Sequence, residues 1–239
     1  MSTPAQAGDA GWVCQTSRCV VTLAGVFASL VRYDGPVSDF REIGRSFAEL
    51  LEDRRGLLVA SRYEAPVSSI VELMARTLGE GRTIFWMGNG GSAADAQHLA
   101  AEFSGRFLRE RAALPSEALT VNTSALTAIA NDFGYDQVFS RQVDAFVKPD
   151  DVVVGITTSG NSPNVINGLL AAKRRGAATV AFTGNGGGRV AEIADLVLCG
   201  PSGYSAIVQE IHIALGHIIC DLVEQQYLRE AARATAVVA

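Results

Sequence analysis

The residues best suited to chemistry in this sequence are two histidines with carboxyl and amide groups near them. His98 and Glu102 are four residues apart in a stretch with helical patterning, so their side chains lie on one face, one turn apart. This spacing suits a metal-binding pair, or a base beside its partner. A second helical stretch, largely apolar, carries Gln209 and His217. A polar side chain on such a helix needs a partner, so we expect His217 to meet His98 and Glu102 instead of serving only as a core or interface histidine.

The spacing of Gln209 and His217 adds a constraint. The eight residues between these positions rise about 12 Å along an α-helix, so one straight helix does not easily bring both side chains to one point. We therefore expect a second copy of the chain to supply one of them, which places the site at a subunit interface. Two amphipathic helices predicted earlier in the chain, at residues 39–51 and from Pro66 to Gly79, also need a hydrophobic surface to cover.

Two loops rich in Gly, Ser and Thr could hold a ligand. They span residues 88–92 and 157–162, and each follows a predicted strand. Glycines let the backbone approach a ligand, and hydroxyls and free amides at a helix start can hold a phosphate group. Neither loop contains Lys or Arg, and the first matches neither the P-loop nor the GxGxxG pattern, which argues against a nucleotide. Such glycines also occur in ordinary strand-to-helix turns, but two of these loops side by side would form a cup.

Strand-like and helical segments alternate around these loops. Short apolar runs predict strands at residues 83–87, 118–121, 151–156, 179–183 and 196–199. Helices are expected at residues 92–108, 125–131, 163–175, 188–194 and 205–233. This alternation predicts an α/β fold with a parallel sheet and helices on both faces, which binds ligands at the carboxyl ends of its strands. Residues 39–239 count as one domain, and residues 1–38 are an extension of unknown role.

Composition excludes several classes of protein. The chain has 239 residues, a net charge of −5 and a pI near 5.3, which argues against a surface for nucleic acid or anionic lipid. The longest early apolar run, residues 20–31, is shorter than the roughly 20 residues of a membrane span. The four cysteines form no CxxC pair, which favours reduced thiols and a cytoplasmic location.

Four runs together closely resemble the phosphoheptose isomerase family, whose members contain a sugar isomerase (SIS) domain. They are GNGGSAADAQHLAAEFSGRF (88–107), ANDFGYDQVFSRQV (130–143), GITTSGNSPNV (155–165) and VQEIHIALGH (208–217). The resemblance covers about residues 39–228. It implies a three-layer αβα sandwich with a mainly parallel, five-stranded, flavodoxin-like sheet preceded by N-terminal helices. It also implies a homotetramer with interfacial active sites.

The activity that this resemblance implies is an aldose–ketose isomerisation. D-Sedoheptulose 7-phosphate would become D-glycero-D-manno-heptose 7-phosphate through an enediolate, the first step toward nucleotide-activated heptoses. Substrate-binding positions carried over from the family are Asn89, Gly90, Gly91, Ser92, Glu102, Asn131, Asp132, Thr157, Thr158, Ser159, Ser162 and Gln209. The family's zinc ligands correspond to His98, Glu102, Gln209 and His217. Glu102 would be the base, and His217 would move a proton between oxygens or help to open the sugar ring, with the metal or Gln209 stabilising the oxyanion.

One departure and one alternative accompany this resemblance. Ile207 occupies a position where the family usually has Arg, so a contact made by that Arg would be missing. The alternative is a non-catalytic protein, because similar proteins bind a replication initiator or sense sugar phosphates. Sensors usually carry a helix-turn-helix segment, and the first 80 residues here lack a basic recognition helix. The complete set of four polar residues in the two helices favours the isomerase.

Overall fold

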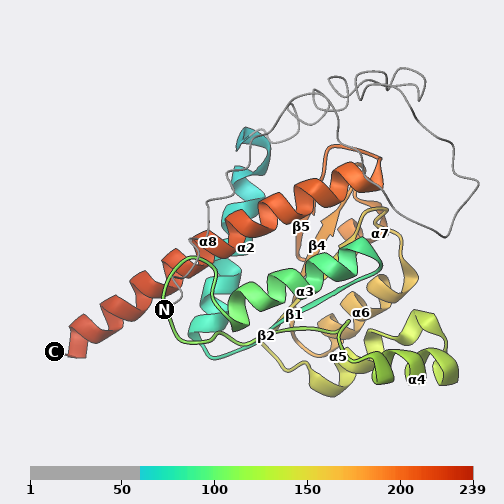
Figure 1. Cartoon of the computed structure of the whole chain (residues 1–239), viewed down its shortest axis with the longest axis horizontal. Helices are drawn as coiled ribbons and strands as arrows, with labels where there is room; N and C mark the ends of the chain where they lie inside the picture. Colours follow the sequence, from blue (N-terminus) through green and yellow to red (C-terminus); the bar gives the residue numbers. More distant parts are fainter. Residues whose placement is uncertain (1–59, 239) are drawn as a thin grey trace, which may run out of the picture. The chain divides into compact units, whose positions relative to one another are not determined.

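The structure, a computed structural model, describes residues 60–238, which belong to a compact unit spanning Ala48–Ala239. The extension at residues 1–38 and the helix expected at residues 39–51 lie outside the described residues. The described part is an α/β fold built on one five-stranded sheet (Figure 1).

All neighbouring strands of this sheet are parallel, as the sequence predicts. In chain order the strands are β1 (Ile84–Gly88), β2 (Ser116–Ala118), β3 (Val152–Thr157), β4 (Ala178–Thr183) and β5 (Leu196–Cys199). Their spatial order is β2-β1-β3-β4-β5, the flavodoxin-like order, which reverses between β1 and β3. Ligands bind such sheets at this reversal. Gly88 pairs with Ile156 there, so the two glycine-rich loops leave the sheet side by side.

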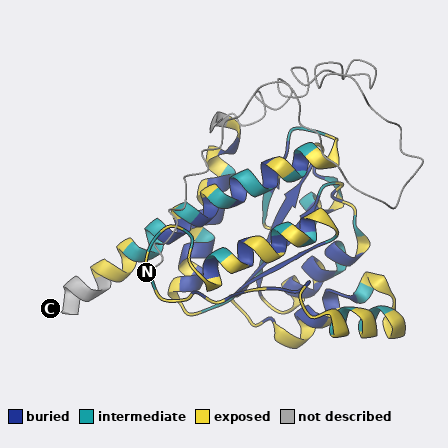
Figure 2. Ribbon diagram, viewed as in Figure 1, coloured by how far each residue is buried: buried dark blue, intermediate teal, exposed yellow. Residues whose placement is uncertain are grey.

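Helices cover both faces of the sheet and enclose two hydrophobic cores. One face is covered by α2 (Ala60–Gly79), α3 (Gly91–Ser104) and α8 (Ser205–Val238). The other is covered by α5 (Ser140–Phe146), α6 (Pro163–Arg174) and α7 (Gly188–Ile193), with α4 (Thr123–Phe133) and the short 3-10 helix η2 (Tyr135–Gln137) leading into them (Figure 1). Figure 2 shows the buried surfaces of these helices turned toward the sheet.

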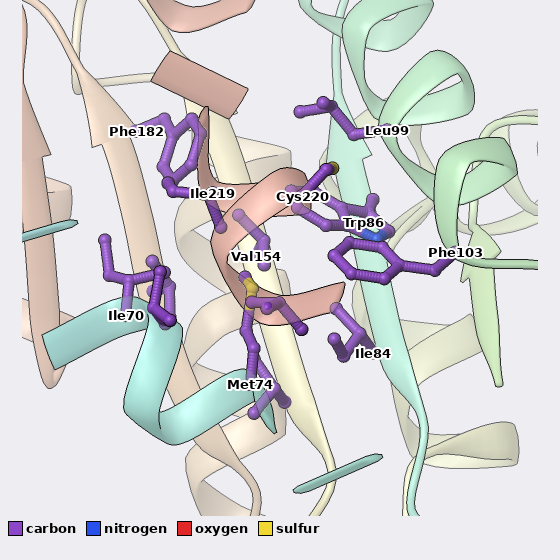
Figure 3. Packing of buried hydrophobic residues seen from close by; sticks show 14 of the residues in the cluster. Ile70, Met74, Ile84, Trp86, Leu99, Phe103, Val154, Phe182, Ile219 and Cys220 are labelled. Carbon is purple, nitrogen blue, oxygen red and sulfur yellow. The ribbon is translucent and has the colours of Figure 1, made fainter. Parts of the chain in front are cut away.

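The strand residues alternate between the two cores, because successive side chains of a strand point to opposite faces. Ile84 and Trp86 enter the core under α2, α3 and α8, whereas Phe85 and Met87 enter the other. Trp86 stacks on Phe103 of α3 at a ring-centroid distance of 6.3 Å, and Figure 3 shows the two rings together. The sheet and the helix that carries His98 and Glu102 are therefore packed firmly against each other.

The apolar character of α8 is explained in part by its position in the core, although Ile218 and Leu222 are exposed. Within the described residues, the segment Ser205–Arg233 is long and apolar enough to cross a membrane by composition alone. Helix α8 lies beside α2 and α3 (Figure 1), and its side chains Ile211, Leu215 and Ile219 are buried in the core that these helices share with the sheet. Figure 3 shows Ile219 in this core.

Several boundaries differ from the sequence prediction. Helix α2 begins at Ala60 and includes Pro66, because buried Tyr63 continues the apolar stripe across the proline. Helix α3 ends at Ser104, where Gly105 caps it, four residues earlier than expected. Strand β2 begins and ends earlier than residues 118–121. The sequence analysis did not predict α5, a helix of seven residues.

A buried histidine makes the stability of this fold depend on pH. His212 on α8 is fully buried and its Nε2 donates a hydrogen bond to the Thr183 carbonyl at 3.0 Å. Its Nδ1 has no hydrogen-bond partner among the described residues. Burial lowers the pKa of His212 to about 4, and the hydrogen bond only partly offsets this effect. His212 is therefore neutral in the folded protein at neutral pH.

We expect the free energy of unfolding to fall as the pH drops from about 6.5 to about 4. In this range His212 binds a proton in the unfolded chain but stays neutral in the folded protein, so acid favours the unfolded chain. The full contribution is about 3 kcal/mol. His212→Gln keeps an amide donor for Thr183 and should reduce this pH dependence, as measured by urea unfolding at several pH values. Parallel pH profiles for the two proteins would contradict the prediction.

Candidate active site

The loop after β1 turns sharply into α3 and leaves polar groups at the edge of the sheet. A Cβ at Gly88 would lie 2.7 Å from the Ser92 carbonyl oxygen, so this position has no room for a side chain. Gly90 has a φ of 57°, in the left-handed region that glycine adopts readily. The turn places the first turn of α3, with its free backbone N–H groups, directly after the end of β1.

A cavity of about 280 Å³ lies between this loop and the loop after β3. It is lined by Asn89, Gly90, Gly91, Ser92, Ile156, Thr157, Thr158, Ser162, Ser205 and Gln209. The lining includes the first residues of α3 and α8 and the residue that precedes α6. Because helix N-termini favour anions, three of them at one cavity can hold a phosphate group without Lys or Arg in the lining.

Hydroxyl groups in the cavity are held by hydrogen bonds to one another. Thr157 Oγ1 lies 2.9 Å from Ser162 Oγ, and Thr158 Oγ1 lies 3.0 Å from Ser205 Oγ. The second bond joins the loop after β3 to the first turn of α8. A hydroxyl can donate to a phosphate oxygen while it accepts from a neighbour, so this arrangement suits a tetrahedral anion.

A side-chain network fixes Asn89 at the opposite rim of the cavity. Asn89 and the buried Asn164 exchange hydrogen bonds at 2.9 and 2.8 Å through their amide groups. The hydroxyl of Tyr135, in η2, donates to Asn89 Oδ1 at 3.0 Å. Asn89 is thus oriented from both sides, and Tyr135 reaches the cavity rim from a segment 46 residues away in sequence.

A second cluster of functional groups joins α3 to α8. His98 Nε2 lies 2.9 Å from His217 Nε2 and 3.5 Å from Glu102 Oε1. Phe107, just beyond α3, stacks on the His217 ring at a centroid distance of 5.5 Å. The structure therefore brings His98, Glu102 and His217 together within one chain.

This cluster fits a metal ion by its donor set. Two imidazole nitrogens and one carboxylate oxygen lie within 4.8 Å of one another, and such donors bind divalent transition metals. His98 has half of its side chain exposed, so the cluster is open to solvent. An open position beside three protein ligands is typical of sites where a substrate can reach a metal.

Asp95 lies one turn before His98 on α3. Burial raises the pKa of Asp95, and the positive charge of His98 partly offsets this effect. Its Oδ2 is buried with no hydrogen-bond partner in the described part of the chain. Asp95 therefore carries a destabilised negative charge on the helix that leads from the cavity to the histidines.

Gln209 lies in the cavity, two turns before His217 on α8. A Cβ added at Gly91 would lie 2.6 Å from Gln209 Nε2, so the amide rests directly on the start of α3. Within one chain, Gln209 thus reaches the cavity while His217 reaches the cluster. This separation agrees with the spacing argument, in which one straight helix does not bring both to one point.

Four of the carried-over substrate-binding positions lie outside the cavity lining in the described structure, and Glu102 is one of them because it belongs to the histidine cluster. Asn131 and Asp132 are exposed near the end of α4 and bonded to each other at 2.8 Å, and Ser159 is exposed in its loop. Ile207 packs against the hydrophobic core, so its side chain takes up an apolar contact in place of the polar one that Arg would make.

The sequence analysis missed Ser205, which lines the cavity, and Tyr135 and Asn164, which form hydrogen bonds with Asn89 at its rim. Tyr135 and Asn164 fall inside the quoted runs, and Ser205 is the first residue of a predicted helix. A signal for Ser205 was available, because serine at a helix start often serves an anion or a cap. The partners of Asn89 could not be found from spacing, because they come from distant segments.

Comparison with known proteins agrees with this geometry. The SIS domain family model matches residues 55–184. The phosphoheptose isomerase of Aquifex aeolicus is 52% identical over 163 residues, which cover 68% of this chain and 85% of that protein. The structure of phosphoheptose isomerase GmhA from Neisseria gonorrhoeae superposes with a TM-score of 0.66 at 44% identity, covering 75% of this chain and 95% of that one. That of a phosphoheptose isomerase from Francisella tularensis gives 0.66 at 31% identity, over 74% and 91%. The chain therefore belongs to the SIS domain family and, within it, to the phosphoheptose isomerase family.

Proposed function

We propose that this protein is an aldose–ketose isomerase that converts D-sedoheptulose 7-phosphate to D-glycero-D-manno-heptose 7-phosphate. The observation that carries the proposal is the position of one helix, α3, whose first residues line the cavity and whose His98 and Glu102 meet His217 of α8. Gly91 and His98 are seven residues apart, about 10 Å along the helix. This distance is comparable to the length of an extended seven-carbon chain, so a phosphate in the cavity would place the far end of the sugar near the cluster.

The isomerisation needs a base, and Glu102 is the candidate. Glu102 would remove a proton from C1 of the open-chain ketose, and the electron pair would form the C1–C2 double bond of an enediolate. The same carboxyl group would return a proton to C2, and loss of the O1 proton would leave the aldehyde. His217 would carry the proton between O1 and O2, because an imidazole ring has one nitrogen that can donate a proton and one that can accept it.

The cavity would contribute to rate as well as to affinity. Binding of the phosphate by Thr157, Ser162 and Ser205 would hold the reacting carbons in register with Glu102. Interactions remote from the reaction can lower its barrier in this way, because they fix orientation before the proton moves.

Zinc is the metal that we propose for the histidine cluster. The 3.5 Å between His98 Nε2 and Glu102 Oε1 matches the separation of about 3.3–3.6 Å between tetrahedral ligands of one zinc ion. The two histidine nitrogens, 2.9 Å apart, would move apart slightly to bind the same ion. A zinc ion held by His98, Glu102 and His217 would supply positive charge beside the enediolate oxygen. Gln209 of a second copy of the chain would be the fourth ligand. The active sites would then lie at the subunit interfaces of a homotetramer, and assembly would be needed for activity.

We place the enzyme in the cytoplasm, where reduced cysteines persist. Among the described residues, Cys199 and Cys220 are free, which supports this placement. The alternative, a non-catalytic sugar-phosphate-binding protein, would need the cavity but has no chemical use for the histidine cluster. The cluster is the feature that favours the enzyme.

Proton NMR of purified protein with sedoheptulose 7-phosphate, with and without added zinc, tests the proposed function. We expect the signals of the aldoheptose 7-phosphate to grow until equilibrium. Shorter ketose phosphates, assayed in parallel, should be converted more slowly because they do not span the distance from cavity to cluster. Phosphate-ligand binding without conversion of any ketose phosphate would favour the non-catalytic alternative.

Tyr135→Phe tests the rim of the cavity. Loss of the hydroxyl removes the hydrogen bond to Asn89, so we expect KM for the sugar phosphate to rise by roughly threefold to tenfold, the effect of one hydrogen bond. The matched control is Tyr227→Phe, because Tyr227 lies on α8 and packs against the core, outside the cavity lining. Equal KM values for the two variants would show that Tyr135 does not position Asn89 for the substrate.

A further inference from the structure

A buried ion pair contacts the end of α3 and the segment that follows it, beside the histidine cluster. Glu224 on α8 is fully buried, and its carboxylate accepts from Arg111 Nε at 2.9 Å. The side chains of both residues are only 1% exposed. Desolvation offsets much of the attraction in a buried ion pair, so such a pair adds little net stability by itself.

The carboxylate of Glu224 also fixes the backbone that follows α3. It accepts hydrogen bonds from the N–H groups of Phe107, Leu108 and Arg109 at 3.2, 3.0 and 2.9 Å. Burial alone would raise the pKa of Glu224, but these N–H groups and the charge of Arg111 outweigh it and hold the pKa below its usual range. Glu224 is therefore ionised at neutral pH, and its charge organises this segment.

Arg111 binds the other end of the same segment. Its guanidinium donates to the carbonyl oxygens of Glu102 at 2.7 Å, Phe103 at 2.9 Å and Gly105 at 3.2 Å. These carbonyls belong to the end of α3, where the helix itself supplies no donors. A positive charge is also favourable at a helix C-terminus. Arg111 thus caps the turn of α3 that carries Glu102.

The fixed segment carries an aromatic ring to the cluster. Phe107 stacks on His217 with an angle of 25° between the ring planes. His217 and Glu224 are seven residues apart on α8, so they lie on the same face of that helix, two turns apart. The ion pair is therefore linked to two members of the cluster. Glu224 holds Phe107, which stacks on His217, and Arg111 holds the end of α3, which carries Glu102.

We propose that Glu224 and Arg111 are positioning residues that set the geometry of the His98, Glu102 and His217 cluster. Their effect on turnover rests on the proposed function, whereas their effect on His217 does not. Without the pair, Phe107 would leave His217, and the last turn of α3 would lose the donor that holds the Glu102 carbonyl.

Glu224→Gln is the principal test, with Glu110→Gln as the matched control. Glu110 lies in the same segment, but its side chain is 87% exposed and pairs with Arg106. The chain has three histidines, so the Cε1–H signals of 13C-labelled histidine can be assigned by substitution. In E224Q we expect the His217 signal to lose the ring-current shift from Phe107, with His212 unchanged. We also expect kcat to fall about tenfold or more, with KM within about threefold.

The results of this test distinguish a positioning role of the ion pair from a purely structural one. A lower Tm for E224Q with unchanged His217 signal and kcat would overturn the proposal, because the pair would then be only structural. If E224Q does not fold, Phe107→Leu leaves the ion pair intact, and it must reproduce the His217 shift and the loss of kcat for the proposal to survive. If the wild-type protein converts no sugar phosphate, the proposed function fails, and the His217 signal alone decides this inference.

Discussion

Glu102→Gln is expected to lower kcat by about 10²- to 10⁴-fold, the usual contribution of a general base. Glutamine has nearly the same shape but cannot accept the C1 proton. Binding of the sugar phosphate should change by less than about threefold, because Glu102 lies outside the lining of the cavity that we assign to the phosphate. Steady-state kinetics and calorimetric titration with inorganic phosphate measure the two quantities separately.

The matched control is Glu117→Gln, because Glu117 is exposed on β2 and lies outside both the cavity and the cluster. It should leave kcat and binding unchanged. Full turnover in E102Q would remove Glu102 from the role of base. A parallel loss of phosphate binding would show that Glu102 acts in binding, contrary to the separation between cavity and cluster.

Gly160→Ala is expected to disrupt the loop after β3, residues 157–162, which we assign to phosphate binding and call the phosphate loop. Gly160 has a φ of 69°, and an added Cβ would lie 2.7 Å from Gly188 Cα and still closer to the Gly187 carbonyl oxygen. Both obstacles are backbone atoms, so a change of rotamer cannot relieve the clash. We expect the free energy of unfolding to fall by about 3 kcal/mol or more, as measured by urea unfolding. Any folded fraction should bind phosphate weakly, because the loop that carries Thr157 and Ser162 would move.

Gly186→Ala separates the clash from the backbone strain. Gly186 also has a positive φ, 87°, but a Cβ there would meet no atom within 4 Å. This variant should therefore lose only about 1 kcal/mol, the cost of a left-handed conformation. If G160A and G186A are equally stable, the close packing of Gly160 against Gly187 and Gly188 does not stabilise the phosphate loop.

The layered fold could be predicted because its strands and glycine turns are local signals. The run 151–156 reads as a buried strand, and Pro163 marks the start of α6, as the structure confirms. Boundaries that depend on tertiary contacts could not be predicted. Pro66 remains inside α2 because Tyr63 and its neighbours gain burial against the sheet, and α5 depends on contacts made by Val143 in the second core.

Part of the candidate site could likewise be predicted from the sequence, and part could not. Helical spacing alone puts His98 and Glu102 on one face, and the apolar surroundings of His217 indicate that it needs a partner, which it finds in the structure. The network of Asn89 with Tyr135, and the ion pair of Glu224 with Arg111, join segments far apart in the chain. Sequence spacing carries no information about such long-range contacts, so these positions appear only in the folded structure.

The central claim, proton transfer through an enediolate, is tested most directly by following the isomerisation of sedoheptulose 7-phosphate in D2O by NMR. A base that takes a proton from C1 and exchanges it with solvent returns deuterium to C2. We therefore expect the wild-type protein to give an aldoheptose 7-phosphate with deuterium at C2, and E102Q to give both product and exchange at C1 at least about 10²-fold more slowly. Absence of product from the wild-type protein, or product that keeps only protium at C2, would contradict this claim.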